Sequence, residues 1–244
     1  MKHIEDQLHG STNNFFSRFQ DYLGEFVYGG IDGSVTTFAV VAGSAGADLD
    51  VSVVIILGFA NLIADGFSMS VGSYLSNKSE LQNYEKHKKV EYWEVENMPE
   101  REIEEIREIY AQKGFKGDLL DKVVEVITAN KDRWVDVMMK EELEMIPSTK
   151  SPFAMGAVTF FSFLLVGLVP LLAYVYDYIS GAQVSHPFLI ASLLTGFAFA
   201  GIGFLKSFVT QTARWKGILE TLFLGASAAV LAYFVGNILE KFIS

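Results

Sequence analysis

Two aspartates stand inside apolar stretches of the chain that are long enough to cross a membrane. Asp32 lies in the first stretch, directly before Gly33, and Asp65 lies near the middle of the second. An ionisable side chain at the centre of a membrane helix costs about 2.5–3.5 kcal/mol on insertion scales, so it normally faces a bundle interior or water. Neither stretch contains Lys or Arg. The two acids therefore need another cation.

The second stretch carries a polar stripe with helical spacing. Asn61, Asp65 and Met69 are four residues apart and share one helix face with Gly58 and Gly72. Oxygen donors and a thioether on one face form a ligand set for a divalent transition metal, or a proton site once the metal leaves. The plainer alternatives are a protonated or hydrogen-bonded aspartate and a methionine that only packs.

A second group of acids lies in the polar region that follows. Helical spacing places Glu102 and Glu105 on the face of Ile106, and Glu91 and Glu94 beside Val95. On a further predicted helix the face of Trp134 is shared by Met138, Glu141, Glu142 and Met145. Three helices thus direct acids toward the side that should be buried.

Clustered carboxylates in a desolvated site repel one another unless a cation neutralises them. Glutamates with one or two methionines, in a chain without Cys, suit Fe²⁺ or Mn²⁺ better than a structural zinc site. The alternative is a solvated acidic face with ordinary Glu–Lys pairs. That alternative fits the remaining acids of the same helix well, namely Glu100, Glu104 and Glu108.

The charge distribution defines the class of protein. Half of the 244 residues are hydrophobic, and 31 of the 48 Lys, Arg, Asp and Glu residues fall between Asn77 and Ser151. This is a membrane composition interrupted by a soluble insert. The composition excludes a disordered chain and a disulfide-stapled domain. The net charge of −10 argues against nucleic acid as a partner.

The predicted fold is all-α: a polytopic membrane protein with five transmembrane helices and a cytosolic helical metal-binding insert. A bilayer core about 30 Å thick needs roughly 20 apolar residues per helix. Five stretches meet that length: Phe26–Ala47, Val51–Leu75, Pro152–Tyr176, Pro187–Phe208 and Gly217–Leu239. Pro170 should kink the third.

The chain then divides into four regions. Residues 1–25 form an amphipathic helix lying along the membrane interface, because Phe15, Phe19 and Tyr22 recur at helical spacing between polar residues. Residues 26–76 hold the first two transmembrane helices, 77–150 the insert and 151–244 the last three. The alternative for residues 1–25 is an amphipathic helix that packs on the insert and does not contact the membrane.

Basic residues predict the orientation. The insert holds thirteen Lys and Arg residues, and the fourth connection is flanked by Lys206, Arg214 and Lys216. The loops 48–50 and 177–186 contain none. The positive-inside rule places the N-terminus and the insert in the cytosol and the C-terminus outside. Within the insert the second helix should continue to Met98, followed by helices at Pro99–Lys113, Asp118–Asn130 and Lys131–Ile146.

These residues resemble the vacuolar iron transporter family. The likeness rests on Asp32-Gly33, on the run from Ala64 to Leu75, on Ser79-Glu80, and on paired E-x-x-E motifs at 91/94 and 102/105. The resemblance implies a homodimeric, proton-coupled antiporter without enzymatic activity, which exports Fe²⁺ from the cytosol, often also Mn²⁺; Zn²⁺ and Co²⁺ are further candidate ions in vitro. The membrane would be the cell membrane of a prokaryote, which the short chain favours, or a vacuolar membrane.

The resemblance also implies roles for individual residues. Asp32 and Met69 match family positions on the transport pathway. The cytosolic ligands match Glu91, Glu94, Glu102, Glu105, Met138 and Glu142. Two departures stand out: Asn61 replaces a family Glu, and Thr37 stands where a proline is common. Because Asp65 lies one helical turn from Asn61, about 5.4 Å along the same face, we hypothesise that it supplies the missing charge.

Other functions remain open from the sequence. A membrane-anchored iron sensor or storage protein would need the insert but neither Asp32 nor Asp65. The insert could also bind iron for regulation and not for delivery. A di-iron enzyme would use paired Glu-x-x-His motifs, and no Glu in this chain is followed by His at the third position. A channel would differ only in lacking coupling to a pH gradient.

Overall fold

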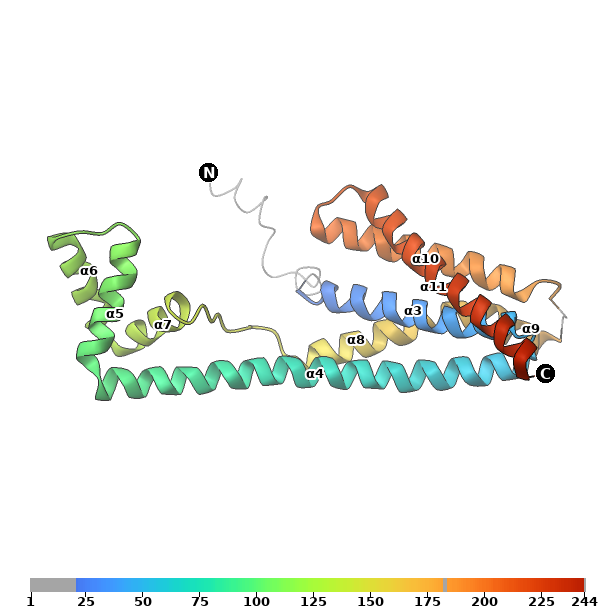
Figure 1. Cartoon of the computed structure of the whole chain (residues 1–244), viewed down its shortest axis with the longest axis horizontal. Coiled ribbons are helices and arrows are strands. Elements are labelled where there is room, and N and C mark those ends of the chain that lie inside the picture. Colours follow the sequence, from blue (N-terminus) through green and yellow to red (C-terminus); the bar gives the residue numbers. More distant parts are fainter. Residues whose placement is uncertain (1–20, 182–183, 244) are drawn as a thin grey trace. The chain divides into compact units, whose positions relative to one another are not determined.

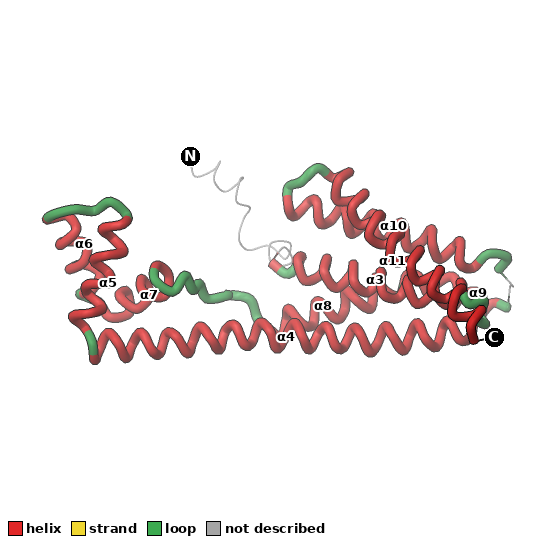
Figure 2. The backbone as a smooth tube through the Cα atoms, viewed as in Figure 1, coloured by secondary structure: helices red, strands yellow, loops and turns green. Residues whose placement is uncertain are grey.

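The computed structural model describes residues 21–181 and 184–243, and all regular structure within these ranges is helical (Figure 2). The all-α prediction is confirmed for this part of the chain. The interfacial helix expected at residues 1–25 falls almost wholly outside the described residues. The chain forms two compact units. The insert predicted at residues 77–150 corresponds to the unit formed by residues 75–149, and from here on the insert means residues 75–149, while the membrane unit means residues 21–74 with 150–243.

The membrane unit contains five helices that are long and apolar enough to cross a bilayer (Figure 1). This number confirms the prediction. The spans are α3 (Leu23–Gly46), the first half of α4 (Val51–Asn97), α8 (Pro152–Gly167) continued by α9 (Leu172–Ser180), α10 (Pro187–Thr210) and α11 (Arg214–Ile243).

Helix α3 lies at the centre of the membrane unit and packs against α8, α10 and α11. Glycine permits the closest of these approaches. A Cβ atom at Gly33 would lie 2.4 Å from the carbonyl oxygen of Phe163, and one at Gly46 would lie close to the backbone of Tyr233. Because α3 is held by three helices, one of them in close contact at the residue next to Asp32, this packing fixes the position of Asp32.

The third span is interrupted at Pro170, as expected. Helix α8 gives way to a short 3₁₀ helix, η1 (Val169–Leu171), before α9 begins. Proline has no N–H to donate and its ring disrupts the preceding turn, which explains the change of helix type. Leu171 is fully buried in the break and contacts α4 at Gly58.

Helix α4 is continuous from the membrane unit into the insert, as the lack of a stop signal predicts. Within the membrane unit the hydroxyl of Ser70 donates a hydrogen bond of 2.9 Å to the carbonyl of Gly156 on α8. The opposite side of α4 is uncovered: Ile63 and Phe67 are 55% and 64% exposed. An apolar face of this kind requires lipid or another membrane helix.

The insert is a small helical domain with its own core. The end of α4 is followed by α5 (Pro99–Gln112), α6 (Asp118–Thr128) and α7 (Lys131–Glu141). Asn130 caps α7 by accepting a hydrogen bond from the backbone of Arg133. The buried core comprises Tyr84, Val95, Ile106, Val124, Ile127, Trp134, Val135, Met138 and Met139.

The predicted helix Lys131–Ile146 is too long. Helix α7 ends at Glu141, where the backbone N–H of Leu143 donates to Met138 and that of Met145 donates to Met139. Glu144 adopts a left-handed conformation with φ of 52°. These bonds satisfy the free carbonyls at the helix end and fold the chain back. Met145 is therefore not on the helical face assigned to it.

Candidate functional site

The two membrane aspartates lie on neighbouring spans. Asp32 on α3 and Asp65 on α4 are both half-buried, and their carboxylates are close enough to repel each other. Neither forms an ion pair with any Lys, Arg or His in the described ranges. Two neighbouring carboxylates without a basic partner form a site that a cation or protons can neutralise.

Asn61 and Met69 flank Asp65 by one turn on either side, and both side chains are half-buried. The amide nitrogen of Asn61 is buried and has no acceptor within the described part of the protein. The two glycines of the same stripe differ in how closely they are packed. Gly58 packs against Leu171, whereas nothing lies within 4 Å of a Cβ placed at Gly72. The polar stripe thus borders the packed face of α4 and does not lie at its centre.

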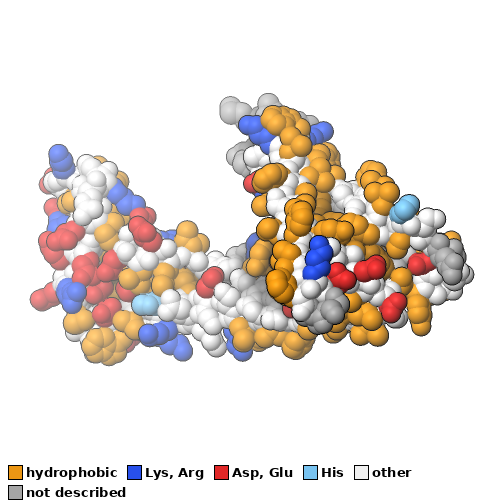
Figure 3. Space-filling view, turned by 45° about the vertical axis from the view of Figure 1, so that its right-hand side comes forward, with side chains coloured by type: hydrophobic (Ala, Val, Ile, Leu, Met, Phe, Trp, Pro, Cys, Tyr) orange, Lys and Arg blue, Asp and Glu red, His pale blue; other side chains and the backbone are white. Residues whose placement is uncertain are grey.

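Acidic side chains gather over the insert, while hydrophobic side chains dominate the visible face of the membrane unit (Figure 3). Two of the acids are buried: Glu91 on α4 is 4% exposed and Glu102 on α5 is 2% exposed. One carboxylate oxygen of each, Oε2, is buried without a hydrogen-bond donor among the described residues. Buried carboxylates without donors strongly favour a proton or a bound cation.

Burial and mutual repulsion raise the pKa values of these acids above the ordinary value for glutamate. Burial, followed by the nearby carboxylates of Glu142 and Glu102, raises the pKa of Glu91 to about 7. Burial and the neighbouring Glu105 raise the pKa of Glu102 to about 7. The pKa of Glu142 is raised by partial desolvation of its carboxyl group and by Glu105. Near neutral pH the cluster therefore exchanges protons readily.

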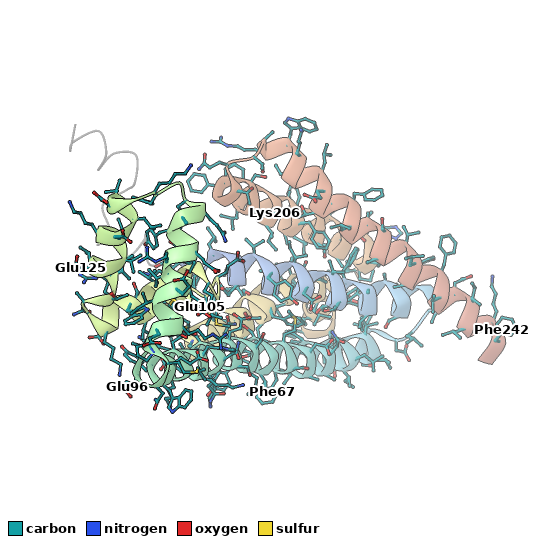
Figure 4. All side chains as sticks on the ribbon, turned by 60° about the vertical axis from the view of Figure 1, so that its left-hand side comes forward. Phe67, Glu96, Glu105, Glu125, Lys206 and Phe242 are labelled. Atoms are coloured by element: carbon teal, nitrogen blue, oxygen red, sulfur yellow. The ribbon has the colours of Figure 1, made fainter. Side chains whose placement is uncertain are left out.

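Glu94 and Glu105 complete the predicted acidic set and are half-buried (Figure 4 labels Glu105 on α5). Oε1 of Glu105 accepts a hydrogen bond of 3.0 Å from Nε of Arg101, one turn earlier on α5. Both acids contribute to the repulsion at Glu91. The acids assigned to the solvated face, Glu100, Glu104 and Glu108, are exposed as expected.

The end of α7 differs in part from the expectation. Glu141 does not face the core; it is exposed and pairs with Lys113 at the end of α5. Glu142, at the C-cap position of α7, is exposed as well, and its carboxylate acts on Glu91 and Glu102 from there. Met138 is fully buried in the insert core. Glu142 keeps a right-handed helical conformation, so helical spacing still accounts for its position, and the chain reverses only at Glu144.

The acids of the insert lie near one another but do not form a complete metal-coordination site in this conformation. Over residues 21–181 and 184–243, no three His, Asp or Glu side chains are gathered tightly enough to hold a metal ion as they stand. The arrangement concentrates negative charge and buried oxygen atoms, and side-chain rotation would be needed to bring three of them onto one ion.

Three residues near these sites were not singled out from the sequence. Arg101 stands four residues before Glu105, a spacing that predicts an ion pair on a helix. Glu25 stands seven residues before Asp32, which places both on one face of α3. Its partner Lys150, 3.7 Å away, is remote in sequence, and only the folded chain reveals the contact.

Comparison with known proteins agrees with the sequence resemblance. A family model described as the VIT family matches residues 23–237. A vacuolar iron transporter of Toxoplasma gondii is 37% identical over 93% of this chain and 77% of its own length. A vacuolar iron transporter of Plasmodium falciparum is 32% identical over 97% and 88%. Vacuolar iron transporter 1 of Arabidopsis thaliana is 31% identical over 88% and 85%.

Proposed function

The chain belongs to the VIT family, and from this premise we propose that it is a proton-coupled transporter that exports Fe²⁺, and also Mn²⁺, from the cytosol. The observation that carries the proposal is the pair Asp32 and Asp65. Two carboxylates that repel each other on neighbouring apolar spans, without a basic partner among the described residues, are costly unless a cation accompanies them.

Exchange at these acids is the proposed mechanism. A divalent ion bound between Asp32 and Asp65 neutralises both carboxylates, with oxygen from Asn61 and the thioether of Met69 as further ligands. Protons arriving from the far side neutralise the same carboxylates and release the ion. Because either the metal or the protons suffice, metal leaving the cytosol is exchanged for protons entering it.

The insert is proposed to collect metal for this pathway. Its ligand set would be Glu91, Glu94, Glu102, Glu105, Glu142 and Met138. The raised pKa values of Glu91 and Glu102, both about 7, mean that arriving metal competes with protons that are bound weakly near neutral pH. Met138 would take part only if its buried thioether turned toward the acids.

Orientation and assembly complete the proposal. The basic residues of the insert and of the 206–216 connection favour a cytosolic insert. A homodimer formed through the membrane helices is supported by α4, where the small residues Ala60, Ala64, Ser68 and Gly72 recur every four positions and are exposed. Packing two copies of α4 along this stripe would bring Asp65 of each copy near the interface.

Reconstitution tests the function directly. Purified full-length chain in proteoliposomes should move Fe²⁺ into the lumen when the lumen is acidic, and the lumen should lose protons as metal enters. Asp32→Asn should abolish both fluxes while Glu108→Gln, an exposed acid, should leave them intact. Metal binding without flux in the wild type would favour a membrane-anchored iron sensor. Flux that does not respond to the pH gradient would favour a channel.

A further inference from the structure

Glu25 and Lys150 form an ion pair at the start of α3. Nζ of Lys150 lies 3.7 Å from Oε1 of Glu25, and the carboxylate side chain is only 14% exposed, compared with 38% for the lysine. The second oxygen, Oε2, is buried and has no hydrogen-bond donor within the described ranges. The lysine thus offsets the charge of Glu25 but leaves one of its oxygens unsatisfied.

The local backbone keeps the two residues together. Tyr22, one turn before Glu25, accepts a hydrogen bond of 3.4 Å through its hydroxyl from the backbone N–H of Ser151. Ser151 in turn caps α8 by accepting from the backbone of Ala154. Lys150 therefore has its backbone fixed beside α3, while its long flexible side chain can turn toward solvent.

Glu25 also has a direct geometric relation to the membrane acids. It precedes Asp32 by seven residues, which is two helical turns, or about 10 Å along the same face of α3. A cation leaving Glu25 would need to advance only these two turns to meet Asp32, whose carboxylate lies within electrostatic reach of Asp65.

We propose that the Lys150 ammonium is a tethered competitor for the Glu25 carboxylate, which a divalent cation must displace on its way to Asp32. The inference rests on the transport function proposed above. A doubly charged ion can satisfy both oxygens of Glu25 and is attracted about twice as strongly as a single charge at equal distance. K⁺ or Na⁺ has no such advantage over the ammonium. Lys150 therefore makes the Glu25 carboxylate selective for divalent ions.

Flux measurements on full-length protein test the competition. Removing the competitor with Lys150→Gln should lower the Fe²⁺ concentration for half-maximal flux by about twofold to fivefold, the range that a partly exposed ion pair supports. It should also make flux more sensitive to inhibition by K⁺. Lys241→Gln, which removes a positive charge in the last turn of α11, is the matched control and should change neither. In a Glu25→Gln background, Lys150→Gln should have a much smaller effect.

Three outcomes would overturn the proposal: an unchanged half-saturating concentration in Lys150→Gln, unchanged K⁺ inhibition, or an equal effect of the substitution with and without Glu25. Lys150→Met, of similar length, replaces the first variant if that one folds poorly. If the wild type moves no metal, the transport function fails, and equilibrium Mn²⁺ binding to the purified chain decides the competition. Tighter binding to Lys150→Gln that depends on Glu25 supports it, and equal binding refutes it.

Discussion

The guanidinium Nε of Arg101 lies 3.0 Å from Oε1 of Glu105, so one acid of the insert is already engaged with a cation of the same helix. The neighbouring Glu102, on the buried side of α5, has an oxygen without any donor in the described structure. Arg101 therefore offsets part of the negative charge of the cluster, and metal that binds there must compete with it.

Removing Arg101 should strengthen metal binding by the insert. An exposed ion pair at this helical spacing is worth about 0.3–0.5 kcal/mol, so Arg101→Gln should lower the dissociation constant for Mn²⁺ by about twofold. Isothermal titration of full-length protein measures the change. Arg107→Gln is the matched control, because Arg107 pairs with Glu104 and Asp121 on the opposite side. Weaker Mn²⁺ binding in Arg101→Gln would show that Arg101 positions Glu105 for the metal.

Glu102 and Glu100 are a matched pair on α5, since one is buried and the other exposed. Glu102→Gln should weaken Mn²⁺ binding by about tenfold or more, because a hydrogen-bonded or charged ligand in a desolvated site is worth about 1.5–3 kcal/mol. Glu100→Gln should have no effect. Binding is measured by titration, and the melting temperature of metal-free protein checks folding. Equal effects of the two substitutions would assign the binding to general surface charge.

The stability of the metal-free insert should depend on pH with an unusual sign. Glu91 and Glu102 each have a pKa raised from 4.5 to about 7 in the folded state, so the folded insert binds more protons than the unfolded one. Their contribution to stability is full below pH 4.5 and is lost as the pH rises to about 7. The melting temperature should fall by a few degrees over this interval.

The fluorescence of Trp134, buried in the insert core, reports this transition in a Trp93→Phe, Trp215→Phe background. Glu91→Gln with Glu102→Gln should reduce the slope of melting temperature against pH. Saturating Mn²⁺ should reverse the slope, because metal binds the deprotonated acids. A slope that is the same with and without both substitutions would exclude these two acids as its cause.

Asp65 should be essential for flux if it supplies the charge missing at Asn61. Asp65→Asn should reduce metal-dependent proton flux in proteoliposomes by at least about tenfold, because the neighbouring Asp32 alone cannot neutralise a divalent ion. Asn61→Glu in the same chain should restore part of the flux, since it returns a carboxylate to that face of α4 one turn earlier. Unaltered flux in Asp65→Asn would contradict the substitution hypothesis.

Helix packing around Asp32 should depend on the adjacent glycine. A Cβ at Gly33 would lie 2.4 Å from the carbonyl oxygen of Phe163, and a backbone atom cannot give way as a side chain can. Gly33→Ala should therefore lower stability by about 1–3 kcal/mol, the usual cost of overpacking. Gly24→Ala on the same helix has open space and should be neutral. Thermal unfolding in detergent compares the two.

The orientation of many site residues could be predicted from the sequence, because an α-helix places residues at fixed angular intervals. Spacing alone predicted that Glu102 faces the core while Glu100 and Glu108 do not, and the structure confirms these positions. The same rule failed beyond Glu141. No proline or glycine interrupts the chain before Pro147, and periodicity cannot detect a helix that ends by folding back onto its own carbonyls.

The sequence by itself determined the five apolar spans, the continuous α4 and the placement of Asp32 and Asp65 within the first two spans, because segment length, hydrophobicity and helical period are local properties. Only the tertiary structure decided which charges meet. Asp32 approaches Asp65, Glu142 joins Glu91, and Lys150 reaches Glu25 across more than a hundred residues. Such encounters depend on how helices pack in three dimensions, and no spacing along a single helix encodes them.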